Sequence, residues 1–296
     1  MNGTGPPLVT PFDTDGELDE PALRDLVGWV EARGVDFLVP CGSNSEAELM
    51  TAAERERAIE VVCDAASVPV LAGTGSPGLR ETLAATADAA AAGADAALVV
   101  TPFYYSHDQP ALEAYYRDLA DEASIPIYLY SVPAYTDVAL APETVGRLAE
   151  HPNVAGMKDS SGDIERFVLT RRETADAEFD LLVGSGSILA PALDAGGDGG
   201  VLALSNVAPA AASEVYERHR GGDREGAHSL NADLVALNRA ITAEYSVPGL
   251  KYAMRERGAP AGHERRPHRP PDESARAALD ARLSALAALD VDAPGA

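Results

Sequence analysis

The chain has 296 residues, of which 46% are hydrophobic and 24% charged, a balance typical of a globular protein. Its net charge of −24 argues against a nucleic-acid partner, because basic side chains must neutralise the phosphate backbone. No apolar run is long enough to span a membrane, and no secretory signal is evident. The two cysteines, Cys41 and Cys63, do not suggest a disulfide framework. We therefore expect a cytoplasmic protein with no membrane partner.

Lysine is unusually scarce in this chain. Only Lys158 and Lys251 are lysines among the 23 basic residues, and the rest are arginine. An acidic, lysine-poor surface predicts a halophilic protein, since salt screens the repulsion within such a surface. A GC-rich genome is the alternative explanation, but it accounts for the arginines and not for the 47 acidic residues. A catalytic lysine would not be hidden among surface lysines here.

Short apolar runs alternate along the chain with segments whose apolar residues recur every three or four positions. The runs predict strands at Pro7–Thr10, Val35–Pro40, Val68–Ala72, Ala96–Thr101, Ile125–Ser131, Val154–Lys158, Phe179–Val183 and Gly200–Leu204. The periodic segments predict helices at Pro21–Arg33, Ala52–Ala66, Leu79–Ala92, Leu112–Glu122 and Pro142–Glu150, and then at Ala210–Arg220, Arg224–Tyr245, Gly249–Arg257 and Glu273–Leu289. Thr51, with Glu54 three residues later, predicts a capping box at the start of the second helix.

Eight strands alternating with helices predict an α/β fold, a (β/α)8 TIM barrel with a C-terminal helical extension. The barrel would span residues 1–208 through the eighth strand, and residues 209–296 would form its final helix and the extension. A doubly wound open sheet is the rival, but no glycine-rich dinucleotide turn follows the first strand. We interpret the glycine-rich Ala192–Gly200 as a turn at the bottom of the barrel, and Ala259–Pro271 as a connector.

Catalytic groups of such barrels lie at the carboxyl ends of the strands. Lys158 ends the sixth predicted strand, after the apolar residues 154–157. Burial there would disfavour the ammonium and leave a free amine that can attack a ketone. A lysine paired with Asp159 at the rim is the structural alternative. In a chain with two lysines, we favour catalysis.

Hydroxyl groups follow neighbouring strands. Tyr130 ends the fifth predicted strand, where its phenol could move protons or could only pack. Ser43 and Tyr104 could assist it, while Gly42, Ser43 and Asn44 could donate hydrogen bonds to a carboxylate. Glycine, serine and asparagine are also common turn residues, so this loop alone is weak evidence.

Neither a metal site nor a cysteine nucleophile is indicated. The six histidines show no metal-ligand spacing on the predicted strands: His107, His151, His219, His228, His263 and His268. Cys41 lies near the rim, but no base is evident beside it. We expect Cys41 to be structural and the protein to need no metal or organic cofactor.

Four segments together resemble the dihydrodipicolinate synthase / N-acetylneuraminate lyase superfamily of class I pyruvate aldolases, over nearly the whole chain. Gly156–Asp163 is similar to its Schiff-base segment. Tyr130–Pro133 is similar to its catalytic-tyrosine segment, 28 residues before Lys158. Pro102–Tyr105 resembles its Pro-Tyr-Tyr motif, and Ser205–Pro209 the segment that follows its eighth strand.

The resemblance implies a role for each matching residue. Lys158 would form a Schiff base with pyruvate, and Tyr130 would transfer protons through Ser43 and the Tyr104 of a neighbouring subunit. The substrate-binding residues would be Gly42, Ser43, Asn44, Val201 and Ser205. The superfamily is usually tetrameric, so the resemblance implies a homo-oligomer, a tetramer built as a dimer of dimers. Its partners would be a small keto acid, pyruvate, and an aldehyde.

Two departures bear on the substrate. Asn44 replaces the second threonine of the family's Gly-Thr-Thr-Gly-Glu loop. Tyr135 stands where dihydrodipicolinate synthases have an arginine that holds a substrate carboxylate. The departure at Tyr135 weakens the assignment to lysine biosynthesis. Ser205-Asn206 and Tyr104-Tyr105 resemble archaeal 2-keto-3-deoxygluconate aldolases more closely.

We therefore expect cleavage of 2-keto-3-deoxygluconate, or its 6-phosphate, to pyruvate and glyceraldehyde or its phosphate, in carbohydrate metabolism of the Entner–Doudoroff type. The first alternative is 4-hydroxy-tetrahydrodipicolinate synthase, and dehydratases and hydratase-aldolases of the superfamily are also open. An alternative of another class is a barrel that binds a keto acid without turning it over.

Overall fold

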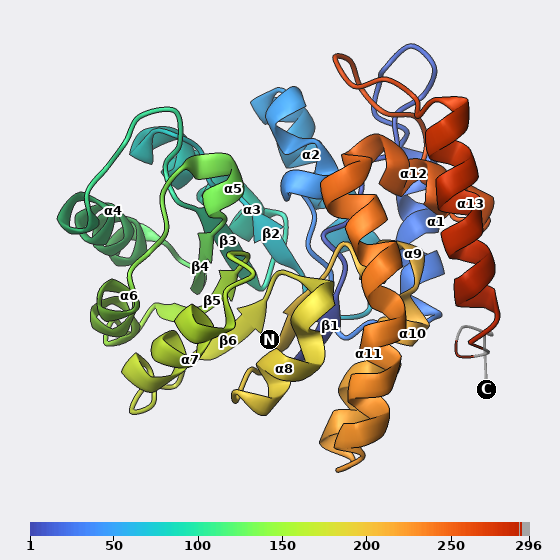
Figure 1. The fold of residues 1–296 in the computed structure, drawn as a ribbon. Helices are drawn as coiled ribbons and strands as arrows, with labels where there is room; N and C mark the ends of the chain where they lie inside the picture. Colours follow the sequence, from blue (N-terminus) through green and yellow to red (C-terminus); the bar gives the residue numbers. More distant parts are fainter. Residues whose placement is uncertain (290, 292–296) are drawn as a thin grey trace.

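The computed structural model describes residues 1–289 and 291 and contains a curled sheet of parallel strands wrapped by helices (Figure 1). The strands are β1 Gly3–Gly5, β2 Leu71–Gly73, β3 Ala96–Val100, β4 Ile127–Ser131, β5 Val154–Asp159, β6 Asp180–Val183 and β7 Gly199–Val201. The helices around the sheet are α1 Glu20–Glu31, α2 Ala52–Ala65, α3 Leu79–Ala91, α4 Gln109–Glu122, α5 Pro133–Thr136, α6 Pro142–Ala149, α7 Ile164–Glu173 and α8 Leu189–Asp194. After β7 follow α9 Leu204–Val207, α10 Pro209–Arg220, α11 Arg224–Arg239, α12 Ser246–Glu256 and α13 Glu273–Ala287.

The sheet order is β1-β7-β6-β5-β4-β3-β2, with every pair parallel. The segment predicted as the second strand, Val35–Pro40, lies between the two ends of this order. The Val39 N–H donates to Pro6 O (3.1 Å) on one side, and the Leu38 N–H donates to Pro69 O (2.9 Å) on the other. These bonds close the sheet into a TIM-barrel-like α/β fold, as the alternation of strands and helices predicted.

The prediction for the first strand was wrong. The strand is Gly3–Gly5, before the predicted Pro7–Thr10, of which Pro7 alone keeps a bridge to Val39. Glycine is required here because β1 and β7 approach closely. A Cβ on Gly199 would lie 1.9 Å from the carbonyl oxygen of Gly3. A strand of small residues carries no apolar run, so the hydrophobic pattern misplaced it.

Two boundaries near the end of the barrel also differ from the prediction. The expected strand Gly200–Leu204 ends at Val201, and Leu204 begins α9. The glycine-rich stretch read as a turn is partly helical, because α8 continues to Asp194 before the turn into β7. The predicted strand Val35–Pro40 forms only isolated bridges, at Leu38 and Val39. Helix α7 was not predicted, and the predicted helix Arg224–Tyr245 ends as an α-helix at Arg239. The other predicted strands and helices lie within a few residues of their predicted bounds, and Thr51 and Glu54 form the predicted capping box.

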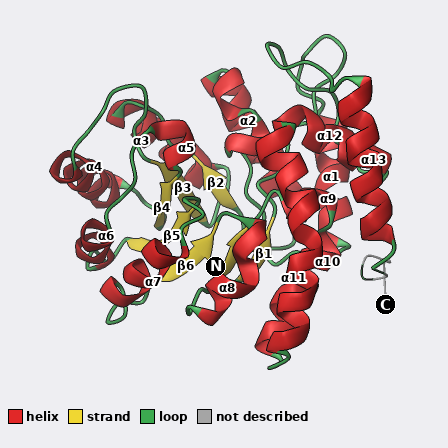
Figure 2. Cartoon of the chain, in the orientation of Figure 1, coloured by secondary structure: helices red, strands yellow, loops and turns green. Residues whose placement is uncertain are grey.

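Two apolar clusters hold this architecture together. The barrel interior is filled by side chains from the strands, including Phe37, Leu98, Tyr130 and Val201, all 5% exposed or less. A larger cluster packs the helices against the outside of the sheet. Helices α10–α13 gather on one side of the barrel, red and orange in Figure 1, while loops join the elements at both ends (Figure 2).

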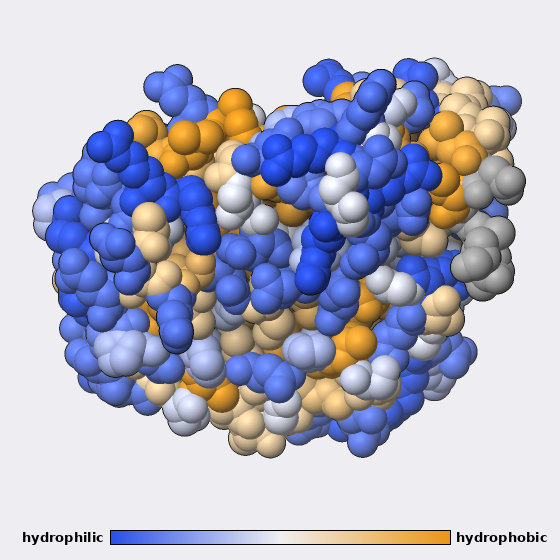
Figure 3. All heavy atoms as spheres, turned by 90° about the horizontal axis from the view of Figure 1, so that it is seen from below, coloured by the Kyte–Doolittle hydropathy of each residue, from blue (hydrophilic) through white to orange (hydrophobic). Residues whose placement is uncertain are grey.

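The surface seen from below is covered largely by hydrophilic side chains, with apolar patches between them (Figure 3). Among the described residues, no helix is long and apolar enough to cross a bilayer.

Candidate active site

Lys158 and Tyr130 lie side by side in the barrel. They are register partners in the β4–β5 pair, and each side chain is about 5% exposed or less. The Lys158 Nζ lies 4.3 Å from the centroid of the Tyr130 ring. Among the described residues, no carboxylate forms an ion pair with Lys158, so the alternative of a pair with Asp159 is not what the structure contains. Burial raises the pKa of Asp159, and one of its carboxylate oxygens accepts from the Ser161 N–H at 2.8 Å.

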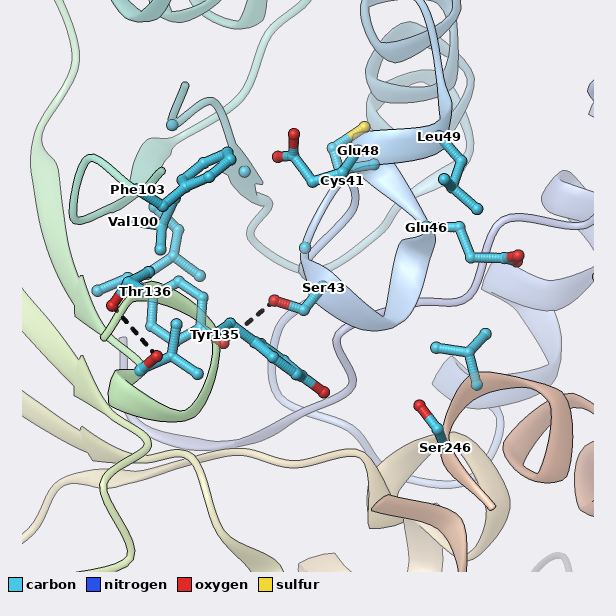
Figure 4. A pocket seen from close by; sticks show the side chains of 18 of the residues that line it. Cys41, Ser43, Glu46, Glu48, Leu49, Val100, Phe103, Tyr135, Thr136 and Ser246 are labelled. Carbon is cyan, nitrogen blue, oxygen red and sulfur yellow. Dashed lines mark hydrogen bonds between the residues drawn. The ribbon is translucent and has the colours of Figure 1, made fainter. Parts of the chain in front are cut away.

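Ser43 meets the Tyr130 phenol from the loop after the Val35–Pro40 segment. The two hydroxyl oxygens are 3.4 Å apart, and a dashed line marks this contact at Ser43 in Figure 4. Ser43 and Asn44 begin a 3-10 turn, Ser43–Ser45. The Gly42 N–H is donated to Ser45 Oγ (2.9 Å), whereas within the described chain the N–H groups of Ser43 and Asn44 have no acceptor. The turn therefore has two N–H groups without an acceptor, of which that of Ser43 belongs to a residue that lines the cavity described below, whereas Asn44 does not line it.

A cavity of about 370 Å³ opens beside this pair. Figure 4 shows Val100, Phe103 and Thr136 on one side of it, and Glu46, Leu49 and Ser246 on the other. Tyr130, Ser43 and Gly42 line the cavity. Lys158 is not among the lining residues, since its amine lies against the Tyr130 ring, which forms part of the wall.

The remaining predicted site residues are placed as follows. Tyr104 is 87% exposed and has a positive φ of 77°, with its ring edge against Tyr105, and it does not line the cavity of its own chain. Val201 is buried in the same interior cluster as Tyr130. Ser205 is fully buried in α9, and among the described residues its hydroxyl has no hydrogen-bond partner. Neither Val201 nor Ser205 lines the cavity.

Cys41 lines the cavity but is unsuited to act as a nucleophile. Burial raises its pKa to about 12, which keeps the thiol protonated. Its sulfur contacts the carbonyl oxygen of Arg55 at 3.5 Å and meets no base. In the described part of the chain, no group of three His, Cys, Asp or Glu side chains is placed to hold a metal ion.

A buried ionic cluster that the sequence pattern did not reveal supports one wall of the cavity. Glu46, fully buried, pairs with the equally buried Lys251 of α12. Lys251 also donates to the carbonyl oxygens of Thr10 and His263, both at 2.7 Å. Glu46 accepts from the Arg265 N–H and from His268 Nδ1, both at 2.9 Å. The nearest signals in the sequence were the second lysine and the acid at the end of the Ser43 loop.

Comparison with known proteins agrees with the barrel fold. The family model described as "Dihydrodipicolinate synthetase family" matches residues 1–286. An uncharacterized DapA-like lyase of Halobacterium salinarum is 40% identical over 98% of this chain and 95% of its own. The 4-hydroxy-tetrahydrodipicolinate synthase of Methanothrix thermoacetophila is 37% identical over 99% of both chains.

Solved structures extend the likeness. The prophage protein YagE of Escherichia coli K12, in complex with pyruvate, superposes with a TM-score of 0.93 at 31% identity, over 97% of this chain and 99% of that one. The chloride-inhibited dihydrodipicolinate synthase of Acinetobacter baumannii, also with pyruvate, gives 0.93 at 32% identity over the same shares.

The fold and site thus define a barrel lyase of the aldolase type. The chain belongs to the dihydrodipicolinate synthetase family. Membership confirms the expected superfamily and the expected class of enzyme. The resemblance to 2-keto-3-deoxygluconate aldolases in particular has no counterpart in these matches.

Proposed function

We propose that this enzyme carries pyruvate as a Schiff base on Lys158 and reversibly joins it to an aldehyde. The observation that carries the proposal is a buried lysine near the end of β5 that has no ion pair with any described residue and whose amine lies against Tyr130. Pyruvate complexes of two family structures support the choice of keto acid. Borohydride reduction with pyruvate tests it, because a barrel that only binds keto acids would gain no covalent adduct.

The mechanism follows from the positions of these groups. In the direction of cleavage, the Lys158 amine attacks the C2 ketone of the 2-keto acid substrate, water leaves, and a protonated imine forms. Tyr130 takes the proton of the C4 hydroxyl, the C3–C4 bond breaks, and its electron pair moves into the imine to give an enamine. The aldehyde leaves, C3 is protonated, and water hydrolyses the imine to release pyruvate. The open N–H groups of Ser43 and Asn44 would hold the carboxylate.

For the second substrate we propose a neutral hydroxyaldehyde, so that the enzyme cleaves 2-keto-3-deoxygluconate in an Entner–Doudoroff route. No arginine or lysine is among the described residues that line the cavity, and Tyr135 is. A phenol can donate one hydrogen bond, but it supplies neither the charge nor the two-pronged grip of a guanidinium on a carboxylate. The 6-phosphate is the weaker candidate for the same reason.

A second candidate is 4-hydroxy-tetrahydrodipicolinate synthase, and the comparisons favour it. Relatives of 37% and 38% identity carry that name, including one from Roseobacter denitrificans. This reaction joins pyruvate to aspartate semialdehyde, whose carboxylate would need a cation from outside the described cavity lining.

A direct competition separates the two candidates. Purified enzyme is given pyruvate with D-glyceraldehyde, its 3-phosphate or aspartate semialdehyde, and kcat/KM is measured for each. We expect D-glyceraldehyde to be used best. Efficient use of aspartate semialdehyde would make the synthase the function and would show that a cation reaches the site.

We further propose a cytoplasmic homotetramer built as two dimers, in which Tyr104 of one subunit completes the relay of its neighbour. The support is the exposure of Tyr104 beside a strained backbone, which leaves its phenol free for another chain. Tyr104→Phe should lower turnover while pyruvate labelling persists. Light scattering that gives a monomer at full activity would contradict this arrangement.

We also propose that the enzyme is adapted to salt, on the strength of its net charge of −24. Activity and assembly should persist in about molar KCl and weaken in dilute buffer, where the acidic surface is unscreened. Full stability in dilute buffer, with no gain from salt, would contradict it.

A further inference from the structure

One wall of the cavity is built by the chain beyond the barrel. Ser246 and Val247 at the start of α12, and His268 from the connector after α12, line it alongside Glu46 and Glu48 of the Ser43 loop. None of these three later residues belongs to a strand. The cavity therefore extends from Tyr130 to a surface that the lysine–tyrosine chemistry leaves unused.

The backbone that brings Ser246 to this wall is irregular. Residues 240–244, between α11 and α12, form a π-helical turn, a feature often found at functional sites. Ser246 follows with a φ of 50°, in the left-handed region that non-glycine residues seldom adopt. Figure 4 shows its side chain among those that surround the pocket.

His268 is held in one orientation by the ionic cluster. Its Nδ1 lies 2.9 Å from a carboxylate oxygen of Glu46, which is itself buried and paired with Lys251. Because a carboxylate accepts hydrogen bonds, Nδ1 is the donor in this contact, and Nε2 is the ring nitrogen left for a ligand. Nε2 has no partner within the described chain, the side chain is 34% exposed, and His268 is one of the residues that line the cavity.

The charges around His268 decide what it can recognise. The ionisable side chains beside it on this wall are the carboxylates of Glu46 and Glu48, and no lysine or arginine lines the described cavity. Glu46 is paired with Lys251, so a phosphate or carboxylate would find no free cation among the described lining residues and would meet the carboxylate of Glu48. An alcohol would donate its proton to Nε2 and could accept one from the Ser246 hydroxyl.

We infer that His268, assisted by Ser246, is a specificity-determining residue that binds the terminal hydroxyl of an uncharged hydroxyaldehyde. This inference rests on the proposed function and names the part of the substrate that this wall selects. It also explains why the far end of the cavity lacks a guanidinium. A site that hydrogen-bonds a substrate hydroxyl rejects the analogue without it, because its own polar groups then stay unpaired.

The test compares D-glyceraldehyde with lactaldehyde, which lacks only the terminal hydroxyl. Each is condensed with pyruvate by the wild type, His268→Leu, His268→Gln and Arg269→Leu. Arg269 is an exposed neighbour on the same connector and does not line the cavity. We expect the wild type to favour D-glyceraldehyde in kcat/KM by about tenfold or more. His268→Leu should bring the ratio of kcat/KM for D-glyceraldehyde to that for lactaldehyde near one, mainly by raising KM for D-glyceraldehyde. His268→Gln should restore part of this preference, and Arg269→Leu should leave it unchanged.

Borohydride labelling of Lys158 with pyruvate is measured on every variant and reports the intact barrel. A wild type that takes no label overturns the proposed function and this inference with it. Full labelling with the same aldehyde ratio in His268→Leu overturns the inference alone. A wild type that prefers D-glyceraldehyde 3-phosphate, and loses that preference in His268→Leu, also overturns it, because the wall would then bind an anion.

Discussion

The two lysines of this chain occupy opposite kinds of environment. Lys158 lies in the barrel with no ion pair among the described residues and an aromatic ring beside its amine. Lys251 is equally buried, but it is held by Glu46, by two carbonyl oxygens and by the ring of Phe12, whose centroid lies 4.7 Å from Nζ. Burial alone does not make a lysine reactive. Lys251 has its three donors occupied, whereas none of the described residues forms a hydrogen bond or ion pair with the Lys158 amine.

The largest expected effect comes from Lys158→Arg. The change keeps a positive charge, but an always-protonated guanidinium cannot form an imine. Pyruvate labelling should disappear and turnover should fall by roughly four decades or more, the scale of losing a covalent nucleophile. Peptide mapping of the wild type should place one label per chain on Lys158. A label on Lys251, or one that survives in the variant, would show that Lys158 is not the lysine that forms the Schiff base.

Lys251→Met should act on stability and leave the chemistry in place. Removing one partner of a buried ion pair costs about 3–5 kcal/mol, because Glu46 then stays buried with less compensation. Urea unfolding measures the loss, and folded variant should still label at Lys158. Adding Glu46→Gln should recover part of the stability. Unchanged stability in Lys251→Met would show that the pair has no structural role.

Tyr130→Phe tests whether the ring beside Lys158 does more than pack. The phenyl ring keeps the contact with the amine, while the hydroxyl that meets Ser43 is removed. Turnover should drop by about two decades, the usual scale for general acid–base help, with labelling retained. Tyr252→Phe, which removes a phenol far from the cavity on α12, is the matched control. Turnover within a few-fold of wild type would leave Tyr130 a packing residue.

The smallest effect is expected from the ion pair of Glu54 with Arg265, whose contribution to stability should depend on pH. A hydrogen bond from Arg265 is the main cause that lowers the pKa of Glu54 from 4.5 to about 2. Because the folded pKa lies below the unfolded one, this pair stabilises the fold above about pH 4.5, and the contribution is lost as the pH falls towards 2. Glu54→Gln should cost on the order of 1 kcal/mol near neutral pH, because the pair keeps some contact with solvent that screens its charges.

Urea unfolding of both proteins at about pH 6 and about pH 3 measures this difference. The gap between wild type and Glu54→Gln should narrow on acidification. A gap that stays constant with pH would mean that Glu54 stabilises the fold by packing and not by charge.

Most of the barrel could be predicted because buried parallel strands are continuous apolar runs. Ile127–Ser131 and Val154–Asp159 carry that signal, and they position Tyr130 and Lys158. Gly3–Gly5 carries none, because close approach of two backbones selects glycine there. The proximity of Lys158 and Tyr130 could be predicted because strand ends in a barrel meet at one rim.

The cavity wall formed by Glu46, Ser246 and His268 could not be predicted from the sequence in the same way. His268 and Glu46 are 222 residues apart, and no periodic pattern joins them. The π-helical turn and the left-handed Ser246 follow from packing across distant segments and not from local propensity. Cys41, by contrast, was correctly expected to be structural, since no base accompanies it.

Glu46 also has a consequence for synthesis of the chain. This carboxylate enters the barrel early, but its partners Lys251, Arg265 and His268 are translated about two hundred residues later. Until they emerge, closing the mouth would bury an uncompensated charge, at a cost of several kcal/mol. We therefore expect the barrel to stay open at this loop until its last helices have been synthesised. A chain truncated before these partners would therefore keep Glu46 uncompensated and the mouth of the barrel open.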